Sequence, residues 1–343
     1  MKELILHIGA EKCGSSSIQS FLMKNRDKLK SFGVCYPETP GVKNQTKITA
    51  YAQDLTKIDS IRKTLGLSSA QDVVNFRDSF GRKFKEEIVS SDCEQFVISN
   101  EHCSSRLLER SEIALLAELF HGIFDSVRVL LYVRPQDEVL ISSYSTQVKS
   151  GSNKSFQFPS SYEKVRFYVK YREIADLWSS VFGRDNVIVV PMHRTSKLGI
   201  GDSVEDLCRR LNILSSDFDS ADKQNVSLDI YKIWFLRGLN EHFDLFVLNT
   251  LNQKRARIVS SLERTKAVGP KFCASFEDRR KFLELFASNN QALFSEYCGF
   301  EENIFSVPSD DSAECRVPER VDSEKIFEIV ADLLEDFDNK YVR

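Results

Sequence analysis

The chain has 343 residues, of which 42% are hydrophobic, 28% are charged, 14 are Gly and 8 are Pro. This composition excludes collagen-like, low-complexity and wholly disordered chains, and the length suits one large domain or two. With 47 Lys and Arg against 50 Asp and Glu, the net charge of −3 argues against a protein that coats nucleic acid.

Eight cysteines are spread along the chain and no two have CxxC spacing, which indicates buried, reduced thiols rather than a metal knuckle or redox motif. The first apolar run ends at Glu11 and Lys12, too soon for the core of a signal peptide. No run approaches the ~18 apolar residues of a membrane span. We therefore expect a cytoplasmic protein without an integral membrane segment.

Short apolar runs alternate with longer amphipathic stretches through the first two thirds of the chain, which predicts βαβ units. The expected fold class is α/β, a P-loop-like three-layer αβα arrangement around a central parallel sheet. The expected strands are residues 4–9, 96–99, 127–133 and 187–191. The expected helices are residues 16–31, 71–91, 107–124, 137–150, 162–182 and 204–211, with no clear period in residues 37–57.

Strand patterns disappear after about residue 222, where only helical spacing is left. The expected helices there are residues 228–248, 277–297 and 323–337. The sequence thus predicts an α/β core over residues 1–221 and a mainly helical C-terminal region, residues 222–343, packed on that core. The last 43 residues carry 13 acidic and 5 basic side chains, an excess for which we have no account beyond solubility.

The first motif that could carry chemistry follows the first strand. A turn runs from Gly9 through Lys12 to Gly14, and three serines, Ser15 to Ser17, open a helix. Unpaired N–H groups and the helix dipole make such a helix start an anion site. In the nucleoside-triphosphate P-loop the lysine follows the second glycine, whereas here it lies two residues before it. A glycine turn capped by serines, without a ligand, is the structural alternative.

The second motif follows the strand at residues 127–133. Arg134 lies at its carboxyl end, where open α/β sheets bind ligands, and guanidinium geometry suits a phosphate. Ser142, eight residues on, could close over the same anion. The structural alternative for Arg134 is an ion pair with Asp137 or Glu138.

The third motif follows the strand at residues 96–99, which delivers Glu101 and His102 to the same edge of the sheet. Either side chain could act as a general base towards a hydroxyl. The structural alternative is a pair of solvated or capping residues before the next helix. His7 lies inside the first strand, where a core histidine is the expected role.

Together these motifs resemble the bacterial branch of the sulfotransferase family, whose donor is 3′-phosphoadenosine 5′-phosphosulfate (PAPS). The family's Lys-x-Gly-[Ser/Thr]-[Ser/Thr] loop binds the 5′-phosphosulfate, and an Arg and a Ser eight residues apart bind the 3′-phosphate. The matching residues here are Lys12, Cys13, Gly14, Ser15, Ser16 and Ser17, followed by Arg134 and Ser142. Cys13 departs from the usual Thr or Ser. The resemblance covers most of residues 1–240 and is weak beyond them.

The resemblance implies transfer of a sulfuryl group to a hydroxyl of a carbohydrate or glycolipid, without a metal, leaving 3′,5′-bisphosphoadenosine. It favours Glu101 over His102 as the base, because this branch often has a Ser-x-Glu pattern, here Ser99 to Glu101. It also explains the basic excess of residues 1–50 and 127–172, since the donor is a polyanion and no nucleic-acid partner is needed. The sequence leaves the oligomeric state open.

Two other functions fit the motifs less well: a P-loop kinase or NTPase, and a non-catalytic nucleotide-binding module. Acceptor contacts are expected in residues 37–57 and 151–161 and in the C-terminal region. Candidate acceptor-contact residues are Asn44, Lys47, Gln147 and Lys149.

Overall fold

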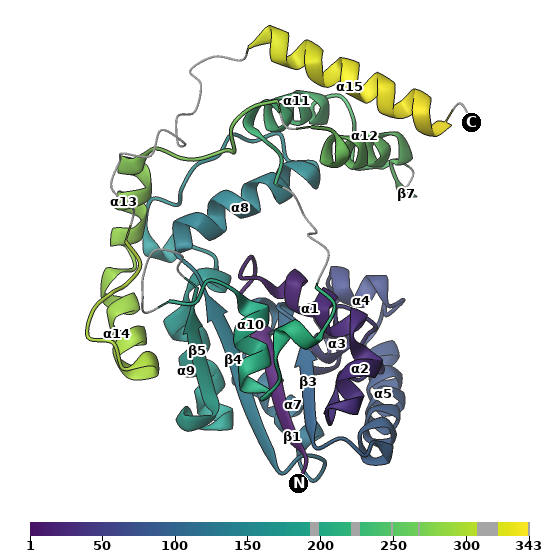
Figure 1. Ribbon diagram of the computed structural model, residues 1–343, viewed down its shortest axis with the longest axis vertical. Coiled ribbons are helices and arrows are strands. Elements are labelled where there is room, and N and C mark those ends of the chain that lie inside the picture. Colours follow the sequence, from purple (N-terminus) through teal and green to yellow (C-terminus); the bar gives the residue numbers. More distant parts are fainter. Residues whose placement is uncertain (193–198, 221–226, 248–249, 267, 307–321, 342–343) are drawn as a thin grey trace. The chain divides into compact units, whose positions relative to one another are not determined.

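The computed structural model describes residues 1–192, 199–220, 227–247, 250–266, 268–306 and 322–341 (Figure 1). The chain divides into two compact units that are each discontinuous in sequence. Unit 1 comprises Met1–Pro135, Val165–Gln224 and Ala287–Phe305, and unit 2 comprises Gln136–Lys164, Asn225–Phe286 and Ser306–Arg343. The chain passes between the units near the predicted boundary at residue 221 and at four other places.

Unit 1 is built on a five-stranded, all-parallel sheet with the strand order β2-β3-β1-β4-β5. Its strands are β1 (Glu3–Gly9), β2 (Val34–Cys35), β3 (Gln95–Ser99), β4 (Ser126–Val133) and β5 (Val187–Pro191). The four predicted strands are confirmed. β2 was not predicted, because two residues are too short for a period-2 pattern to show.

The central strand β1 fixes the edge at which the candidate residues meet. Ile5 pairs with Val97 of β3 on one side and Arg128 of β4 on the other. β1 is buried from Leu4 onward, as expected of a parallel strand covered on both faces. Parallel pairing brings the carboxyl ends of β1, β3 and β4 to one edge.

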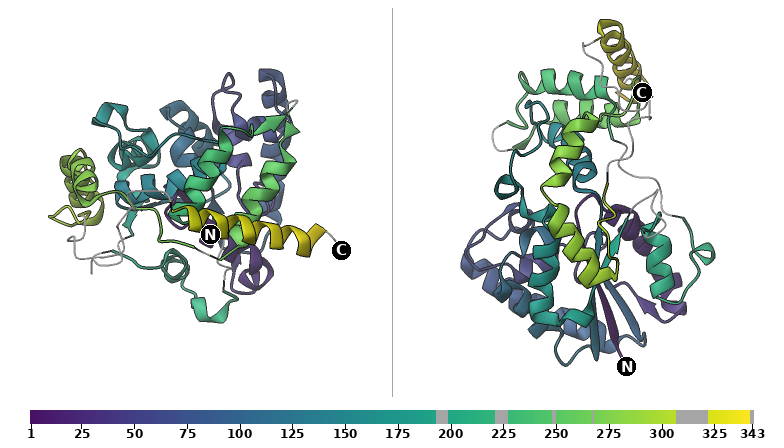
Figure 2. Two further views of the ribbon diagram at one scale, coloured as in Figure 1. Left: turned by 90° about the horizontal axis from the view of Figure 1, so that it is seen from above. Right: turned by 90° about the vertical axis from the view of Figure 1, so that its left-hand side faces the viewer.

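Helices flank both faces of this sheet, so the predicted α/β fold class is confirmed (Figure 1, Figure 2). The helices of unit 1 are α1 (Ser15–Lys24), α2 (Arg26–Ser31), α3 (Lys47–Ala52), α4 (Ser60–Thr64), α5 (Ala70–Ser90), α6 (His102–Arg106), α7 (Arg110–Phe120), α9 (Tyr171–Phe182), α10 (Ser203–Arg210) and α14 (Ala287–Cys298). Short 3-10 turns are η2 (Phe167–Val169), η3 (Arg184–Asn186) and η4 (Ser215–Asp217).

Some helix boundaries differ from the predicted ones for local reasons. The single helix predicted over residues 16–31 breaks at Asn25, whose amide donates to Phe21 O and to Asp219 O at 2.9 Å each. An asparagine side chain that bonds the backbone competes with helix continuation. Residues 107–124 are α-helical only over α7, and residues 162–182 form two short 3-10 turns before α9.

Unit 2 contains α8 (Gln136–Lys149), α11 (Ile230–Asn240), α12 (Gln253–Arg264), α13 (Phe276–Glu284) and α15 (Ser323–Tyr341), with the turn η1 (Tyr162–Lys164). Its core comprises Tyr144, Val148, Leu228, Ile233, Leu236, Leu262, Ile329 and Leu333. The described helices of both units include none long and apolar enough to cross a membrane.

Unit 2 corrects two expectations about the C-terminal region. The helix predicted over residues 228–248 ends at Asn240. It is followed by two antiparallel strands of two residues each, β6 (Phe246–Val247) and β7 (Thr250–Leu251). The helix predicted over residues 277–297 is two helices, α13 and α14, which belong to different units. α12 was not predicted; Asn252 begins it by accepting from Arg255 N.

Candidate functional site

The loop after β1 is a tight turn that ends in a helix N-terminus. Ala10 N–H donates to Tyr132 O at 2.7 Å, which extends the sheet to the start of the turn. Lys12 and Gly14 then take left-handed backbone conformations, with φ of 64° and 84°. Gly14 is the N-cap of α1, so the N-cap residue has no side chain with which to cap this helix. The first N–H groups of α1 follow directly from this turn.

Ser15 gives this helix start a further property. Its side chain is only 5% exposed, and its Oγ is buried without a hydrogen-bond partner among the described residues. Buried hydroxyls almost always have a partner, and a helix N-terminus attracts anions. The loop therefore offers an anion a donor that nothing in the described chain uses.

Gly14 is required by space as well as by conformation. A Cβ at this position would meet the side chain of Ser203, in the first turn of α10, and would lie 3.5 Å from Met192 Cε. α10 is in turn attached to the sheet, because Tyr132 Oη donates to Asp206 Oδ2 at 2.9 Å. The loop is thus backed closely by the start of α10.

A second glycine brings the end of β3 against the end of β1. A Cβ on Gly9, which has φ of 90°, would lie 2.7 Å from Glu101 Cβ and 2.8 Å from Glu101 Cα. Asn100 N–H donates to His7 O at 2.9 Å and keeps the two chain segments in register. Glu101 therefore lies directly beside the point at which the anion-binding loop leaves the sheet.

Two amides bind the Glu101 carboxylate. Gln19 Nε2, on α1, donates to Oε2 at 2.6 Å, and Asn44 Nδ2 donates to Oε1 at 3.3 Å. Gln19 is only 2% exposed. Asn44 had been predicted as an acceptor contact, whereas Gln19 was missed. The sequence signal that could have identified Gln19 is its position next to Ile18, near the buried face of an amphipathic helix.

His102 faces a different partner. Its Nδ1 lies 3.6 Å from Glu11 Oε1, and both side chains are about a quarter exposed, at 26% and 28%. Burial alone raises the pKa of Glu11, but His102, Ser105 and the charge of Arg106 outweigh it and hold that pKa below its usual value. The two predicted base candidates are adjacent in sequence but sit in separate hydrogen-bonding environments.

Arg134 lies at the end of β4 as predicted. Its carbonyl accepts from Tyr171 Oη at 2.8 Å. Burial, and next to it the proximity of the Cys13 thiol, raise the pKa of Tyr171 well above its ordinary value. The Tyr171 hydroxyl thus fixes the backbone of Arg134 at the end of β4.

The remaining candidates lie in unit 2 or in the core. Ser142 is on α8. Asp137, a predicted partner of Arg134, binds Arg279 Nε at 2.6 Å, and Lys149 binds Glu263 at 2.8 Å. His7 is a core residue, as expected: Nδ1 lies 2.8 Å from Ser99 Oγ, and burial lowers its pKa to about 3.

Comparisons with known proteins give distant similarities. No family model matches the chain. A curated but uncharacterized protein from Archaeoglobus fulgidus is 27% identical over 203 residues, 58% of this chain; the chain spans only 53% of that relative. A crystal structure of a sulfotransferase from Alicyclobacillus acidocaldarius matches 75% of this chain and 99% of its own, at 14% identity and a TM-score of 0.41. Similarity at this level assigns no activity, so a function must rest on the site's own geometry.

Proposed function

We propose that the protein is a sulfotransferase that moves a sulfuryl group from PAPS to an acceptor hydroxyl. The observation that carries this proposal is the position of the Glu101 carboxylate. Gly9 admits it to the end of β1, next to a loop in which a helix N-terminus and the unpartnered Ser15 hydroxyl offer an anion site. A base and an anion site beside each other are what transfer from an anionic donor to a hydroxyl requires.

The donor would be held by residues of the first loop and of the end of β4. Lys12, Cys13 and the start of α1 from Gly14 to Ser17 would bind the 5′-phosphosulfate through the lysine charge, backbone N–H groups and hydroxyls. Arg134, at the end of β4, would bind the 3′-phosphate. PAPS supplies the activated sulfuryl group. Lys12 and the helix N-terminus stabilise the negative charge that grows on the leaving phosphate, a role for which the proposal needs no metal.

Glu101 would act on the acceptor. Its carboxylate takes the proton of the acceptor hydroxyl as the new oxygen–sulfur bond forms and the bond from sulfur to the phosphate oxygen breaks, which leaves 3′,5′-bisphosphoadenosine. Gln19 and Asn44 fix the carboxylate through both oxygens. His102 stays outside this role, because its Nδ1 faces Glu11.

The acceptor would be a carbohydrate or glycolipid that approaches along residues 37–57. The hydrogen bond from the Asn44 side chain to Glu101 supports this segment. The polar amide side chains beside Glu101 suit an acceptor that presents hydroxyl groups.

A binding assay followed by a transfer assay tests the proposal. We expect 3′,5′-bisphosphoadenosine to raise the melting temperature without Mg²⁺, and sulfate from radiolabelled PAPS to reach a glycan acceptor. Glu101→Gln should keep the bisphosphate shift and lose the transfer. Stabilisation by ATP together with Mg²⁺, but not by 3′,5′-bisphosphoadenosine, would identify a kinase or NTPase instead. A bisphosphate shift with no transfer by the unaltered protein would identify a non-catalytic binding module.

A further inference from the structure

We infer that Gln19 and Asn44 are positioning residues that make Oε1, rather than Oε2, the proton-accepting atom of Glu101. This inference rests on the proposed sulfotransferase function. It goes beyond that function by assigning an atom, two residues and a change of hydrogen-bond direction during turnover.

The two carboxylate oxygens are held unequally. Gln19 Nε2 lies 2.6 Å from Oε2, the distance of a strong charge-assisted hydrogen bond. Asn44 Nδ2 lies 3.3 Å from Oε1, near the long end of the hydrogen-bond range. The bond at Oε2 stabilises negative charge there, whereas Oε1 keeps lone pairs that an acceptor hydroxyl can reach.

Gln19 also couples the base to the anion-binding loop. Ser15 and Gln19 are four residues apart on α1, so they lie on one face of the helix, and both are buried. The helix that presents its first turn to an anion thus holds Oε2 one turn later. Glu101 is anchored to the same rigid element as the loop.

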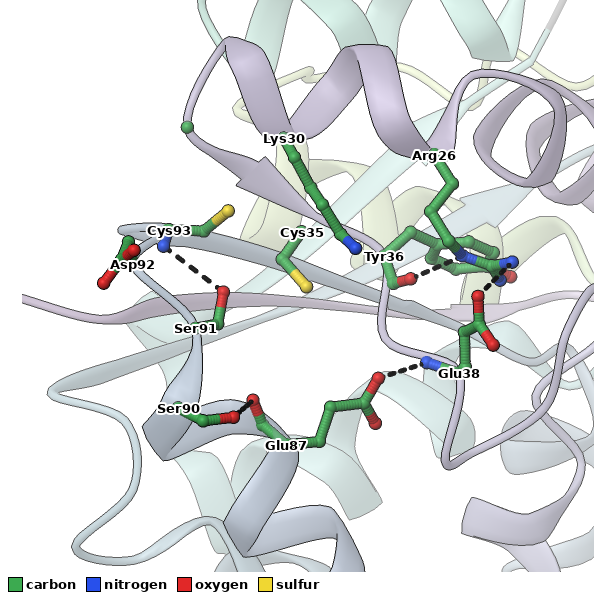
Figure 3. A pocket seen from close by; sticks show the side chains of 11 residues that line it. Arg26, Lys30, Cys35, Tyr36, Glu38, Glu87, Ser90, Ser91, Asp92 and Cys93 are labelled. Atoms are coloured by element: carbon green, nitrogen blue, oxygen red, sulfur yellow. Dashed lines mark hydrogen bonds and ion pairs between the residues drawn. The ribbon is translucent and has the colours of Figure 1, made fainter.

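Asn44 is held by its neighbours on both sides. Arg26, on α2, donates to Tyr36 O at 2.9 Å and pairs with Glu38 (Figure 3). It also donates to Val42 O at 2.5 Å. The hydroxyl of Tyr36 donates to Lys43 O.

On the other side, Gln45 N–H donates to Ser99 O at 3.3 Å and Gln45 Oε1 accepts from Ser99 N–H at 2.8 Å. Hydrogen bonds on both sides therefore hold the backbone at Asn44 in place. The position of that backbone sets the long distance from Asn44 Nδ2 to Oε1.

The Asn44 amide has one further feature that fits a protonation step. Its Oδ1 is buried and has no hydrogen-bond partner among the described residues. While Glu101 is ionised, Nδ2 donates to Oε1. Once Oε1 carries the proton, half a turn of the amide presents Oδ1, which then accepts from the new O–H. An amide can serve both states, whereas a group that only donates or only accepts serves one.

Variants of the two amides separate this role from a purely structural one. Gln19→Met removes the donor at nearly constant volume, and we expect a fall in kcat of about 10-fold and a shift of the acidic limb of the pH–rate profile to higher pH, because the ionised base loses its strongest donor. Asn44→Asp keeps the size but cannot donate when ionised. It should lower kcat more than it raises the acceptor KM. Gln71→Met, on an exposed turn of α5, is the matched control.

A measurement that needs no turnover completes the test. The 13C resonance of the Glu101 carboxyl, assigned by its loss in Glu101→Gln, is titrated in the unaltered protein and in each variant. We expect the midpoint to move to higher pH in Gln19→Met, and further in Gln19→Glu, which also serves if the methionine variant does not fold. Unmoved midpoints would overturn the inference. Moved midpoints in a protein that transfers no sulfate would refute the proposed function and keep the hydrogen-bond assignment.

Discussion

Two segments meet at Glu101, and they are built in opposite ways. The loop from Gly9 to Ser17 takes its shape from residues within it: glycines with positive φ, a sharp turn and a helix start. The segment from residue 36 to residue 62, which carries Asn44, contains the short helix α3 and the start of α4, and it is held by hydrogen bonds from the side chains of Arg26, Arg62 and Arg77.

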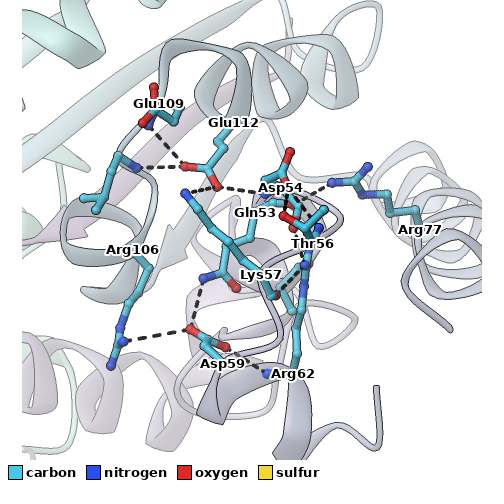
Figure 4. Close-up of polar contacts among 12 residues, drawn as sticks. Gln53, Asp54, Thr56, Lys57, Asp59, Arg62, Arg77, Arg106, Glu109 and Glu112 are labelled. Atoms are coloured by element: carbon cyan, nitrogen blue, oxygen red, sulfur yellow. Dashed lines mark hydrogen bonds and ion pairs between the residues drawn. The ribbon is translucent and has the colours of Figure 1, made fainter. Parts of the chain in front are cut away.

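Arg62 shows how the second segment is fastened. Its guanidinium is fully buried and donates to the carbonyls of Ala50, Gln53, Asp54 and Lys57 at 2.5–3.0 Å (Figure 4). Arg77 adds bonds to Tyr51 O and Gln53 O. The contrast teaches that one half of the candidate site depends on local backbone conformation and the other half on hydrogen bonds from arginine side chains to backbone carbonyls.

The largest expected effect lies where the two segments meet. Glu101→Gln should lower kcat by about 10²- to 10⁴-fold, the usual contribution of a general base, because the amide cannot take the proton. His102→Asn should stay within a few-fold of the unaltered protein in the same radiolabelled transfer assay. Equal losses in both variants would show that the separation between their environments has no bearing on the chemistry.

The next effect probes the loop alone. Lys12→Ala should lower kcat by about 10²- to 10³-fold, roughly 3 kcal/mol of lost transition-state stabilisation, with little change in melting temperature. Lys24→Ala, at the far end of α1 where Nζ binds Ser220 O, is the matched control. Near-normal turnover by a folded Lys12→Ala protein would refute a role for the loop in charge stabilisation.

A stability effect of similar size probes the other segment. Arg62→Met should lower the free energy of unfolding in urea by about 3 kcal/mol or more, because it removes every hydrogen bond that this buried guanidinium donates to four carbonyls. Two of these carbonyls keep another donor, since Gln53 O also accepts from Arg77 and Asp54 O from Lys57 N–H. Arg77→Met, which removes two hydrogen bonds at a more exposed position, should cost about half as much. If the Arg62 variant unfolded at the same urea concentration as the parent, the arginine hydrogen bonds would not be what holds this segment.

The smallest effect concerns His7, in the strand between the two segments. The folded-state pKa of His7 is about 3 and its ordinary value is 6.5, so the unfolded chain binds a proton that the folded chain does not. Stability should therefore fall as the pH drops below about 6.5, by about 2 kcal/mol between pH 7 and pH 5.

His7→Asn keeps a polar atom near Ser99 and removes this titration. Urea unfolding at pH 7 and pH 5 should show a larger loss for the parent than for the variant, and parallel losses would contradict the assignment.

The same contrast explains which features could be predicted from the sequence. The four longer strands are buried on both faces and are therefore nearly continuous apolar runs, which the sequence shows directly. Gly9, Gly14 and the serines that follow them indicate the loop because these residue types favour a tight turn and a helix start. The contact between Gln19 and Glu101 joins residues 82 apart, and no local pattern encodes it. The burial of Arg62 cannot be predicted from the sequence either. An arginine is expected at the surface, and it is buried here because the fold places four carbonyls around it.

The interleaving of the two units escaped prediction for a related reason. Helices α8 and α14 are only weakly amphipathic, so their sequences indicate neither a clear buried face nor the neighbour that buries it. Residue order therefore suggested one boundary after residue 221, whereas packing groups α8 with the C-terminal helices and α14 with the sheet.

Gln45 also covers the outer edge of β3, away from the candidate site. β2 pairs with β3 for only two residues, so the outer edge of β3 near Ser99 would otherwise present bare backbone groups. Gln45 occupies both of them, and its Nε2 is in turn bound to Pro37 O at 2.6 Å. Open strand edges invite pairing with other chains and aggregation. A single glutamine thus stands in for a missing strand and keeps this edge of the sheet closed to other molecules.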